Sequence, residues 1–371
     1  MTEAAARNPE RAKKNNMSRK INILGAGAAG LTAAICLAQA GRSVDVFDNR
    51  SDCGERFGGD FQGLENFSSS LDALDELRMI GLDVNFDCTP KDKVTLTDGH
   101  KLKEVHLPTP FVYMVRRGPM AGSLDQGLKQ QALEAGVRLN FGKTLPNNEV
   151  DLVATGPRTK KAFAAAMGVI FETSMDDTMI VMFNERAAFQ GYSYIGVRQG
   201  SGCLCSVVFG DLKKLKGCFE ETKRLFHRLV DLDIRNPSLM SGVGALSMRP
   251  TFRSGTTLYA GEAAGLQDLL YGFGIRSAFQ SGALAAKCLL DGSDYEHAAR
   301  PQFVNRLKAG LVNRYAWEKL GRLQGMDAFH VRGAELFLRH PGWIYNLRLW
   351  HRLAWPIANR YIRSKYGDRA Y

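Results

Sequence analysis

A glycine-rich turn near the N-terminus constrains the fold of this chain more than any other segment. The sequence GAGAAG at 25–30 follows a buried-strand run at 21–24 and precedes apolar residues at helical spacing. Gly25 permits a tight turn, Gly27 lets the backbone approach a pyrophosphate, and Gly30 lets the helix pack closely on the strand. Because the N–H groups of a helix N-terminus attract anions, the turn predicts a dinucleotide site.

The segment after this helix completes a β–α–β unit. Residues 44–47 form a second apolar strand run that ends at Asp48, about twenty residues after the turn, where a carboxylate accepts ribose hydroxyls. Parallel strands joined by a right-handed crossover belong to a doubly wound sheet. The expected fold class is therefore α/β, with a doubly wound Rossmann-type domain.

A second glycine-rich region lies far along the chain. It consists of GEAAG at 261–265 and YGFGI at 271–275, and a helix with one apolar face begins at its end. Two such turns that close on a helix N-terminus make a second surface of N–H groups, which can receive an anion or a carbonyl.

Together the two regions resemble the FAD-binding flavoproteins of the p-hydroxybenzoate hydroxylase type, and among them the geranylgeranyl reductase family. The resemblance covers 20–160 and 245–290 and implies that the first turn holds the adenosine diphosphate of FAD and the second its isoalloxazine end. It also implies flavin contacts from the loop 53–59 and from the arginine that precedes a helix expected at 124–135. The residues assigned to the cofactor are Gly25, Gly27, Ala28, Ala29, Gly30, Asp48, Asn49, Arg56, Arg117, Gly156, Gly261, Glu262, Gly272, Gly274 and Ile275.

The chain departs from the family pattern at three points. Gly261-Glu262 stands where the family has Gly-Asp, so the carboxylate is kept on a longer arm. Thr155-Gly156 replaces the Asp-Gly that serves nicotinamide binding in the hydroxylases, and the Trp-x-Trp string of flavin halogenases is missing. Since no second GxGxxG marks a dedicated domain for it, NAD(P)H is a candidate only for transient binding at the flavin face.

These assignments divide the chain into four parts. The first twenty residues are rich in lysine and arginine without an apolar stretch, which predicts a disordered basic tail. Alternating strand-like segments predict an inserted antiparallel sheet that covers the substrate. The expected parts are a tail at 1–19, an FAD-binding domain at 20–83, 117–160 and 251–300, a substrate-covering β-sheet domain at 84–116 and 161–250, and a helical C-terminal region at 301–371.

No residue belongs to a recognisable catalytic motif. The resemblance implies that flavin N5 is the reacting centre, and the protein positions a substrate against it. Tyr271, Gln267 and Tyr192 are candidate pocket residues, because they lie within or beside the second glycine-rich region or on the covering sheet. For the tyrosines, half-buried packing is the commoner role. Cys203 and Cys205 share a strand face and predict core packing, and the spacing of cysteines and histidines predicts no metal site.

The segment 341–371 combines aromatic, apolar and basic residues. Apolar residues keep helical spacing from Trp343 through Leu347 and Trp350 to Tyr361, although Pro356 must break or kink the run. This segment contains six lysines and arginines but only one aspartate. Such an element is typical of a peripheral membrane contact or of a lid over a hydrophobic substrate tunnel, with a helix packed on its own domain as the alternative.

Charge and composition restrict the location and the partners. The formal charge of +11 predicts attraction to anions, and seven scattered cysteines are typical of reduced thiols in a cytosolic protein. No apolar stretch is long enough to span a bilayer, and no aromatic-basic motif predicts nucleic-acid binding. We therefore expect a cytoplasmic protein that contacts a hydrophobic small molecule and, through 341–371, the inner face of a membrane.

Three functions fit the sequence. The leading hypothesis is an FAD-dependent reductase or dehydrogenase that acts on an isoprenoid or lipid-like substrate by hydride transfer at flavin N5. The first alternative is a flavin-dependent monooxygenase on a small organic substrate. The second is a non-catalytic prenyl-binding escort protein, which would purify colourless or with an inert cofactor.

Overall fold

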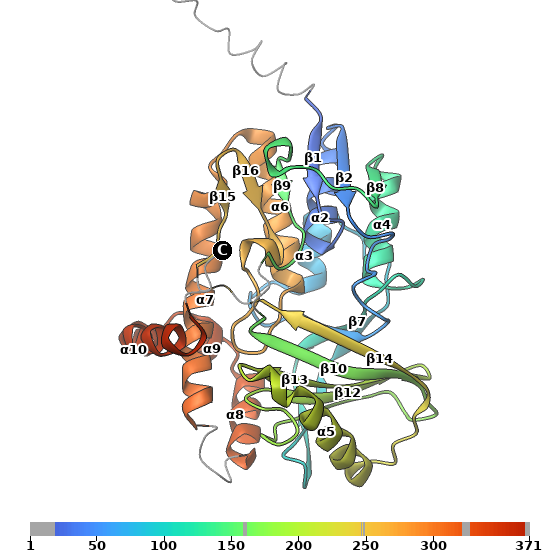
Figure 1. Cartoon of the computed structure of the whole chain (residues 1–371), viewed down its shortest axis with the longest axis vertical. Coiled ribbons are helices and arrows are strands. Elements are labelled where there is room, and N and C mark those ends of the chain that lie inside the picture. Colours follow the sequence, from blue (N-terminus) through green and yellow to red (C-terminus); the bar gives the residue numbers. More distant parts are fainter. Residues whose placement is uncertain (1–18, 159–161, 246, 248, 321–326, 368–371) are drawn as a thin grey trace, which may run out of the picture.

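The computed structural model describes residues 19–158, 162–245, 247, 249–320 and 327–367. Residues 1–18 of the expected N-terminal tail lie outside the described residues. Figure 1 shows a nucleotide-binding part with a parallel sheet above a second, β-rich part, and the C-terminal helices run along one side of both.

The nucleotide-binding part is built on a six-stranded sheet. The chain runs outward from the first strand in both directions, so the turn after that strand opens at a topological switch point. All neighbouring strands pair in parallel except the antiparallel pair at one edge. This arrangement confirms the expected doubly wound sheet. The strand order is β15 (Arg253–Ser254), β16 (Thr257–Tyr259), β9 (Leu152–Val153), β1 (Ile21–Leu24), β2 (Val44–Asp48) and β8 (Arg138–Phe141).

Helices cover the faces of this sheet. Helix α2 (Ala28–Gln39) packs against both α4 (Leu124–Glu134) and α6 (Ile275–Asp291), and α3 (Ala73–Met79) lies nearby. α4 begins at its N-cap Ser123, whose Oγ accepts a hydrogen bond from the Gln126 N–H. The helices expected after the first strand and at 124–135 are thus present.

The second part contains a seven-stranded sheet. Its strands pair antiparallel except for one parallel pair, β11 with β5. Gln199 and Gly200 both adopt positive φ in the hairpin turn expected at 199–202. The strand order is β14 (Arg235–Gly244), β10 (Ala164–Glu172), β13 (Ser201–Phe209), β12 (Tyr192–Arg198), β11 (Thr178–Met182), β5 (Lys93–Thr97) and β6 (Leu102–His106).

Helix α5 (Leu215–Leu229) covers this sheet and was not expected from the strand pattern. Its buried residues include Phe219, Leu225 and Phe226, which share one helix face, while charged residues occupy the other. A small three-stranded sheet, β3 (Phe61–Glu65), β7 (Val112–Arg116) and β4 (Cys88–Lys91), joins the two parts. The segment 84–116 therefore contributes strands to both the seven-stranded and the three-stranded sheet.

The C-terminal region is helical, as expected. It contains α7 (Tyr295–Leu320), α8 (Asp327–Arg339), α9 (Gly342–Tyr345) and α10 (Leu349–Tyr366). Of the break or kink expected at Pro356, a break does not occur, because α10 runs through this proline. Pro356 is exposed, so water can bind the carbonyl that loses its helical partner. Trp343 and Leu347 precede α10 instead of continuing its spacing, and no helix in the described part of the chain is long and apolar enough to cross a bilayer.

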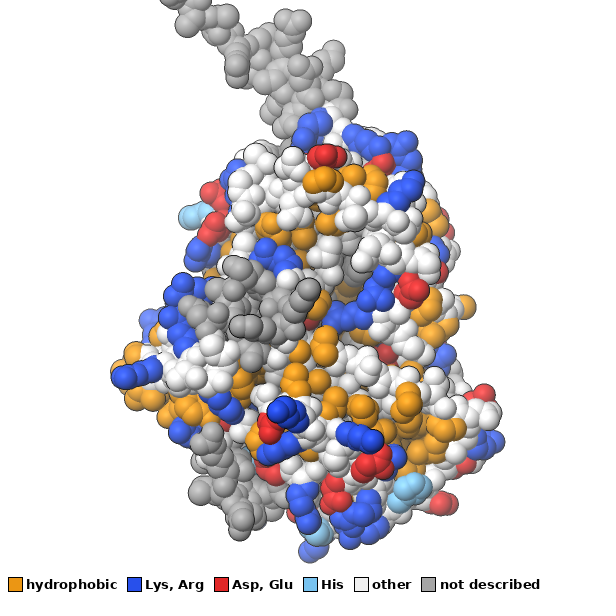
Figure 2. Space-filling view, viewed as in Figure 1, with side chains coloured by type: hydrophobic (Ala, Val, Ile, Leu, Met, Phe, Trp, Pro, Cys, Tyr) orange, Lys and Arg blue, Asp and Glu red, His pale blue; other side chains and the backbone are white. Residues whose placement is uncertain are grey.

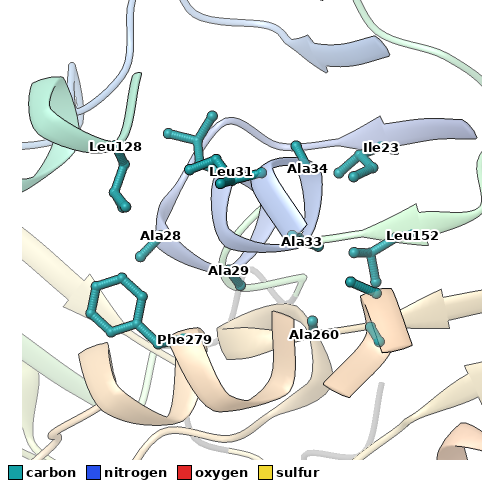
Figure 3. Packing of buried hydrophobic residues seen from close by; sticks show 14 of the residues in the cluster. Ile23, Ala28, Ala29, Leu31, Ala33, Ala34, Leu128, Leu152, Ala260 and Phe279 are labelled. Atoms are coloured by element: carbon teal, nitrogen blue, oxygen red, sulfur yellow. The ribbon is translucent and has the colours of Figure 1, made fainter. Parts of the chain in front are cut away.

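Small residues let α2 and α6 approach closely beside the sheet. Figure 3 shows Ala28, Ala29 and Ala33 of α2 on the side of Phe279 and Ala260. A Cβ added at Gly282 of α6 would lie 2.3 Å from the Ala29 carbonyl oxygen, closer than real atoms approach.

This crossing predicts the effect of one methyl group. We expect Gly282→Ala to lower the free energy of unfolding by about 1–3 kcal/mol, because the backbones must separate. Equilibrium urea unfolding measures the change. The matched control is Gly217→Ala in α5, where an added Cβ meets no atom within 4 Å, and we expect it to raise stability by about 0.5–1 kcal/mol. Equal effects of the two substitutions would contradict the close crossing.

Candidate functional site

One large cavity lies between the parallel sheet and the second sheet. Its volume is about 610 Å³, and it runs from the first glycine-rich turn past the second and into the space between the two parts. Most sequence-predicted site residues line it: Gly27, Ala28, Ala29, Asp48, Arg56, Arg117, Gly156, Tyr192, Gly261, Glu262, Gln267, Tyr271, Gly272, Gly274 and Ile275. Gly25, Gly30 and Asn49 do not.

The three glycines of the first turn occupy three different environments. Gly25 has φ +109°, and a Cβ added to Gly30 would lie 1.9 Å from the Gly25 carbonyl oxygen. Gly27 lines the cavity, and a Cβ added there would meet no protein atom within 4 Å. The first and third glycines are therefore needed for the turn itself, while Gly27 leaves room for a ligand at the N-terminus of α2.

Asp48 ties the end of β2 to this turn. Its Oδ2 accepts a hydrogen bond of 2.8 Å from the Ala26 N–H, and its Oδ1 accepts one of 2.9 Å from the Arg50 N–H. An ionised carboxylate can accept further donors, such as ribose hydroxyls. Asn49 is exposed outside the cavity lining, and Arg50 lines the cavity beside Asp48.

Arg56 joins the loop 53–59 to the second glycine-rich region. Its Nη1 lies 2.8 Å from Glu262 Oε2, and its Nη2 donates to the Val243 carbonyl oxygen at 2.6 Å. The other oxygen, Glu262 Oε1, is buried against the cavity without a hydrogen-bond partner in the described residues. Such an acceptor is costly to leave unpaired, which favours a hydroxyl donor from a ligand.

Arg117 is buried and held by Asp125. Its Nε and Nη2 donate to the two carboxylate oxygens of Asp125 at 2.9 and 2.8 Å, and its guanidinium carbon lies 4.1 Å from the centre of the Phe57 ring. The Gly118 N–H also donates to Asp125 at 2.9 Å. Because its charge is paired, Arg117 positions the loop containing Phe57 as well as lining the cavity.

The second turn presents backbone to the cavity. Helix α6 begins after Gly274 without a side-chain cap, and both Gly274 and Ile275 line the cavity. Gln267 Nε2 donates to the Gly272 carbonyl oxygen at 3.0 Å, while its Oε1 is buried without a partner in the described residues. Asp268 accepts the N–H groups of Tyr271 and Gly272, and burial raises its pKa. The turn is therefore rigid and has free N–H groups at a helix start.

The tyrosine candidates have structural contacts. Tyr192 donates its hydroxyl to the Tyr271 carbonyl oxygen at 2.9 Å, and Tyr194 donates to the Phe61 carbonyl oxygen at 3.0 Å. Burial raises the pKa of both Tyr192 and Tyr271. Tyr271 packs edge-on against the Trp317 ring. These contacts explain the tyrosines as packing residues that shape the cavity wall.

Sequence analysis did not find the apolar half of the cavity. Among the described lining residues, those from β5, β11, β12, β13 and α8 carry no charged side chain. The alternation within β5 and β11 could have indicated inward-facing residues, but no sequence signal brings α8 to them. The residues missed are Val94, Leu96, Met179, Val181, Phe183, Cys205, Val207, Phe209, Ala334, Phe337 and Leu338, with Phe111 and Val112 beside them.

The residues of the polar half fit a dinucleotide. Gly27 leaves open space at a helix N-terminus, where phosphates bind. Asp48 and the unpaired Glu262 Oε1 are acceptors suited to sugar and sugar-alcohol hydroxyls. Within the described residues, no group of histidine, cysteine, aspartate or glutamate side chains is arranged to hold a metal ion.

Comparison with known proteins agrees with this geometry. Residues 23–60 match the family model of an NAD(P)-binding Rossmann-like domain, and no curated protein sequence matches the chain. A geranylgeranyl bacteriochlorophyll reductase-like protein from Thermoplasma acidophilum superposes with a TM-score of 0.66 at 16% identity, over 94% of this chain and 96% of that one.

Two further solved structures with similar folds are enzymes named for other reactions. A flavin-dependent brominase has a TM-score of 0.61 at 15% identity, over 92% of this chain and 100% of its own. The tetrameric form of 2-methyl-3-hydroxypyridine-5-carboxylic acid oxygenase has a TM-score of 0.54 at 16% identity, over 85% of this chain and 96% of its own.

The chain therefore has the fold of the FAD-dependent oxidoreductases of the p-hydroxybenzoate hydroxylase type, with a Rossmann-type nucleotide-binding domain. A geranylgeranyl reductase-like protein is among its structural neighbours. The fold expected from the two glycine-rich regions is confirmed.

The contact between Arg56 and Glu262 predicts a measurable coupling. We expect a double-mutant cycle of Arg56→Gln and Glu262→Gln, based on free energies of unfolding, to give a coupling energy of about 1 kcal/mol. The reason is that both side chains are partly shielded from water. Urea unfolding of the four proteins measures it. The control pair Arg224 and Glu221, three residues apart on α5, should couple more weakly, because Arg224 is exposed to solvent. A coupling of zero between Arg56 and Glu262 would contradict the contact.

Proposed function

We propose that the chain is an FAD-dependent oxidoreductase that acts on an apolar substrate. The observation that carries the proposal is the continuity of one cavity with two chemically different halves. The polar half contains glycines, carboxylates and helix N-termini, whereas the apolar half is lined by aliphatic and aromatic side chains. A redox cofactor and a hydrophobic substrate therefore have adjoining places.

The polar half supplies the groups that FAD requires. The N–H groups at Gly27, Ala28 and Ala29 would bind the pyrophosphate, and Asp48 would accept ribose hydroxyls. Glu262 Oε1 would accept a hydroxyl of the ribityl chain. When bound, the flavin supplies a centre that accepts or donates a hydride.

The second turn would tune the cofactor. N–H groups of Gly274 and Ile275 at the start of α6 favour negative charge on a ring carbonyl, so they would stabilise the reduced form. Gln267 and Asp268 hold this turn by hydrogen bonds to its backbone. The protein thereby fixes the donors before the ligand arrives.

The apolar half selects the substrate by desolvation. An anionic group placed there would lose its water without gaining a paired charge, which costs several kcal/mol. Small aromatic acids are therefore disfavoured, and a neutral isoprenoid or lipid-like chain is favoured. We propose a reductase or dehydrogenase reaction on such a chain, with NAD(P)H as a transient electron donor.

Cofactor binding is testable by comparing two glycines. We expect the purified protein to be yellow and to bleach with dithionite, and Gly27→Val to weaken FAD binding by about tenfold or more, because a side chain keeps phosphate from the N–H groups. Titration of the apoprotein with FAD measures the affinity. Gly217→Val is the control, since an added Cβ at Gly217 also meets no protein atom. Protein that neither contains FAD nor takes it up would refute the proposal.

The reaction type is testable without oxygen. We expect the dithionite-reduced protein to be reoxidised anaerobically by a lipid that carries an unsaturated geranylgeranyl chain, followed by visible absorption. Reoxidation by crotonate, a small unsaturated acid that could also accept a hydride, should not occur, because its carboxylate is excluded from the apolar half. Turnover that needs dioxygen would show a monooxygenase instead, and bound flavin that no reductant bleaches would fit an escort protein.

A further inference from the structure

We propose that α9 and α10 form a docking surface for an anionic lipid bilayer. This surface, called the C-terminal face, contains the exposed apolar residues Trp343, Leu349, Trp350, Leu353 and Ile357 and the basic residues Arg348, Arg352 and Arg360. Figure 2 shows apolar side chains bordered by basic ones where α10 projects from the molecule on the left.

The apolar part of the C-terminal face is a stripe along α10. Leu349, Leu353 and Ile357 follow one another at four-residue spacing and are 72%, 71% and 62% exposed. The opposite side of the helix is buried through Ala358 and Ile362. The stripe is therefore not part of the core, and most of its surface is open to solvent.

The two tryptophans extend the stripe. Trp343 and Trp350 are 60% and 41% exposed, and the guanidinium carbon of Arg348 lies 4.8 Å from the centre of the Trp343 ring. Indole rings are amphipathic and are enriched at the level of lipid headgroups. Clustered exposed tryptophan and leucine next to arginine are typical of a helix that lies in the plane of a membrane surface.

The charges around the stripe identify the occupant as anionic. From Leu336 to Gly367 the chain contains no aspartate or glutamate. Arg348, Arg352 and Arg360 are exposed and have no ion pair within the described residues. Each such arginine adds attraction to an anionic lipid surface.

The same charges disfavour a second copy of this chain. In a two-fold contact each arginine of the C-terminal face would approach its own symmetry mate or another arginine, with no carboxylate of the face to pair with. The face does not serve as the lid either, because no residue of 341–367 lines the described cavity, whereas Ala334, Phe337 and Leu338 of α8 do.

Polar contacts with α7 hold both α9 and α10 in place. Lys365 Nζ lies 2.7 Å from Glu318 Oε2 of α7, and the Asn313 side chain donates to the Ile344 carbonyl oxygen at 2.7 Å. The C-terminal face is therefore presented by a helix anchored to α7, so no ordering of a free segment opposes docking.

Docking would bring the apolar half of the cavity to the bilayer. Helix α8 lines the cavity with Phe337 and Leu338, while Leu336 on its outer side is 61% exposed. This consequence rests on the proposed function, because it supplies an apolar substrate from the lipid. The docking surface itself does not, and its test needs no flavin chemistry.

Co-sedimentation of the full-length protein with vesicles tests the docking. We expect binding to vesicles of phosphatidylcholine mixed with phosphatidylglycerol and weak binding to phosphatidylcholine alone. Leu353→Gln/Ile357→Gln should lower the partition coefficient by about tenfold or more, because two side chains lose their apolar contact with the lipid. The control Met79→Gln/Leu133→Gln changes two other exposed apolar residues and should bind as the unmodified protein does.

The charge part has its own variant. Arg348→Gln/Arg352→Gln/Arg360→Gln should reduce binding to the anionic vesicles on the order of tenfold or more, and added salt should have the same direction of effect. The control Lys101→Gln/Lys143→Gln/Lys216→Gln removes the same formal charge elsewhere on the surface. Equal losses for the two triple variants would show only a net-charge effect and overturn the proposal.

Other outcomes also decide it. Absence of vesicle binding, or a concentration-dependent dimer that Leu353→Gln/Ile357→Gln dissolves, overturns the proposal. Far-ultraviolet circular dichroism and bound FAD are measured for every variant. Unchanged folding with lost vesicle binding supports docking, and FAD bound without vesicle binding rejects docking while leaving the proposed function intact.

Discussion

The close approach of backbone around Ala29 is the constraint on which the rest of the structure depends. A Cβ added at Gly261 would lie 2.9 Å from the Ala29 Cβ, and one added at Gly282 would lie 2.3 Å from the Ala29 carbonyl oxygen. Both glycine-rich regions therefore meet at one residue of α2, although they are far apart in the sequence. Only the missing side chains allow this approach, and it places two helix N-termini at one cavity.

A buried arginine connects this arrangement to the C-terminal helices. Arg314 of α7 donates to the carbonyl oxygens of Leu269, Leu270 and Gln190, so it bridges the second turn and the second sheet. Its guanidinium carbon also lies 3.8 Å from the centre of the Phe209 ring. A buried cation is tolerated because each guanidinium nitrogen donates a hydrogen bond and the group also stacks on an aromatic ring. The helices after residue 300 thus support the site as well as covering it.

The cavity joins two environments that need different neighbours. The polar half is made of turns between strands and helices, where backbone N–H groups are free. The apolar half lies against strand faces and α8, where backbone groups are already paired and only side chains reach the cavity. The proposed function and the proposed docking surface on α10 are tested separately, but they are compatible, because an apolar substrate would reside in the bilayer that the surface contacts.

The sequence by itself determined the doubly wound sheet, the two turns and most of the residues that line the polar half. These depend on local chemistry: Gly25 and Gly30 are required by the geometry of one turn, and Asp48 by its place at a strand end. The apolar half, the continuity of α10 through Pro356 and the pairing of Arg56 with Glu262 were decided only by the tertiary structure. Helix α5 differs, because its apolar residues recur at helical spacing and the sequence could have predicted it. The first three depend on which surfaces become buried against one another, and a periodic pattern shows that a face is buried without showing which distant segment covers it.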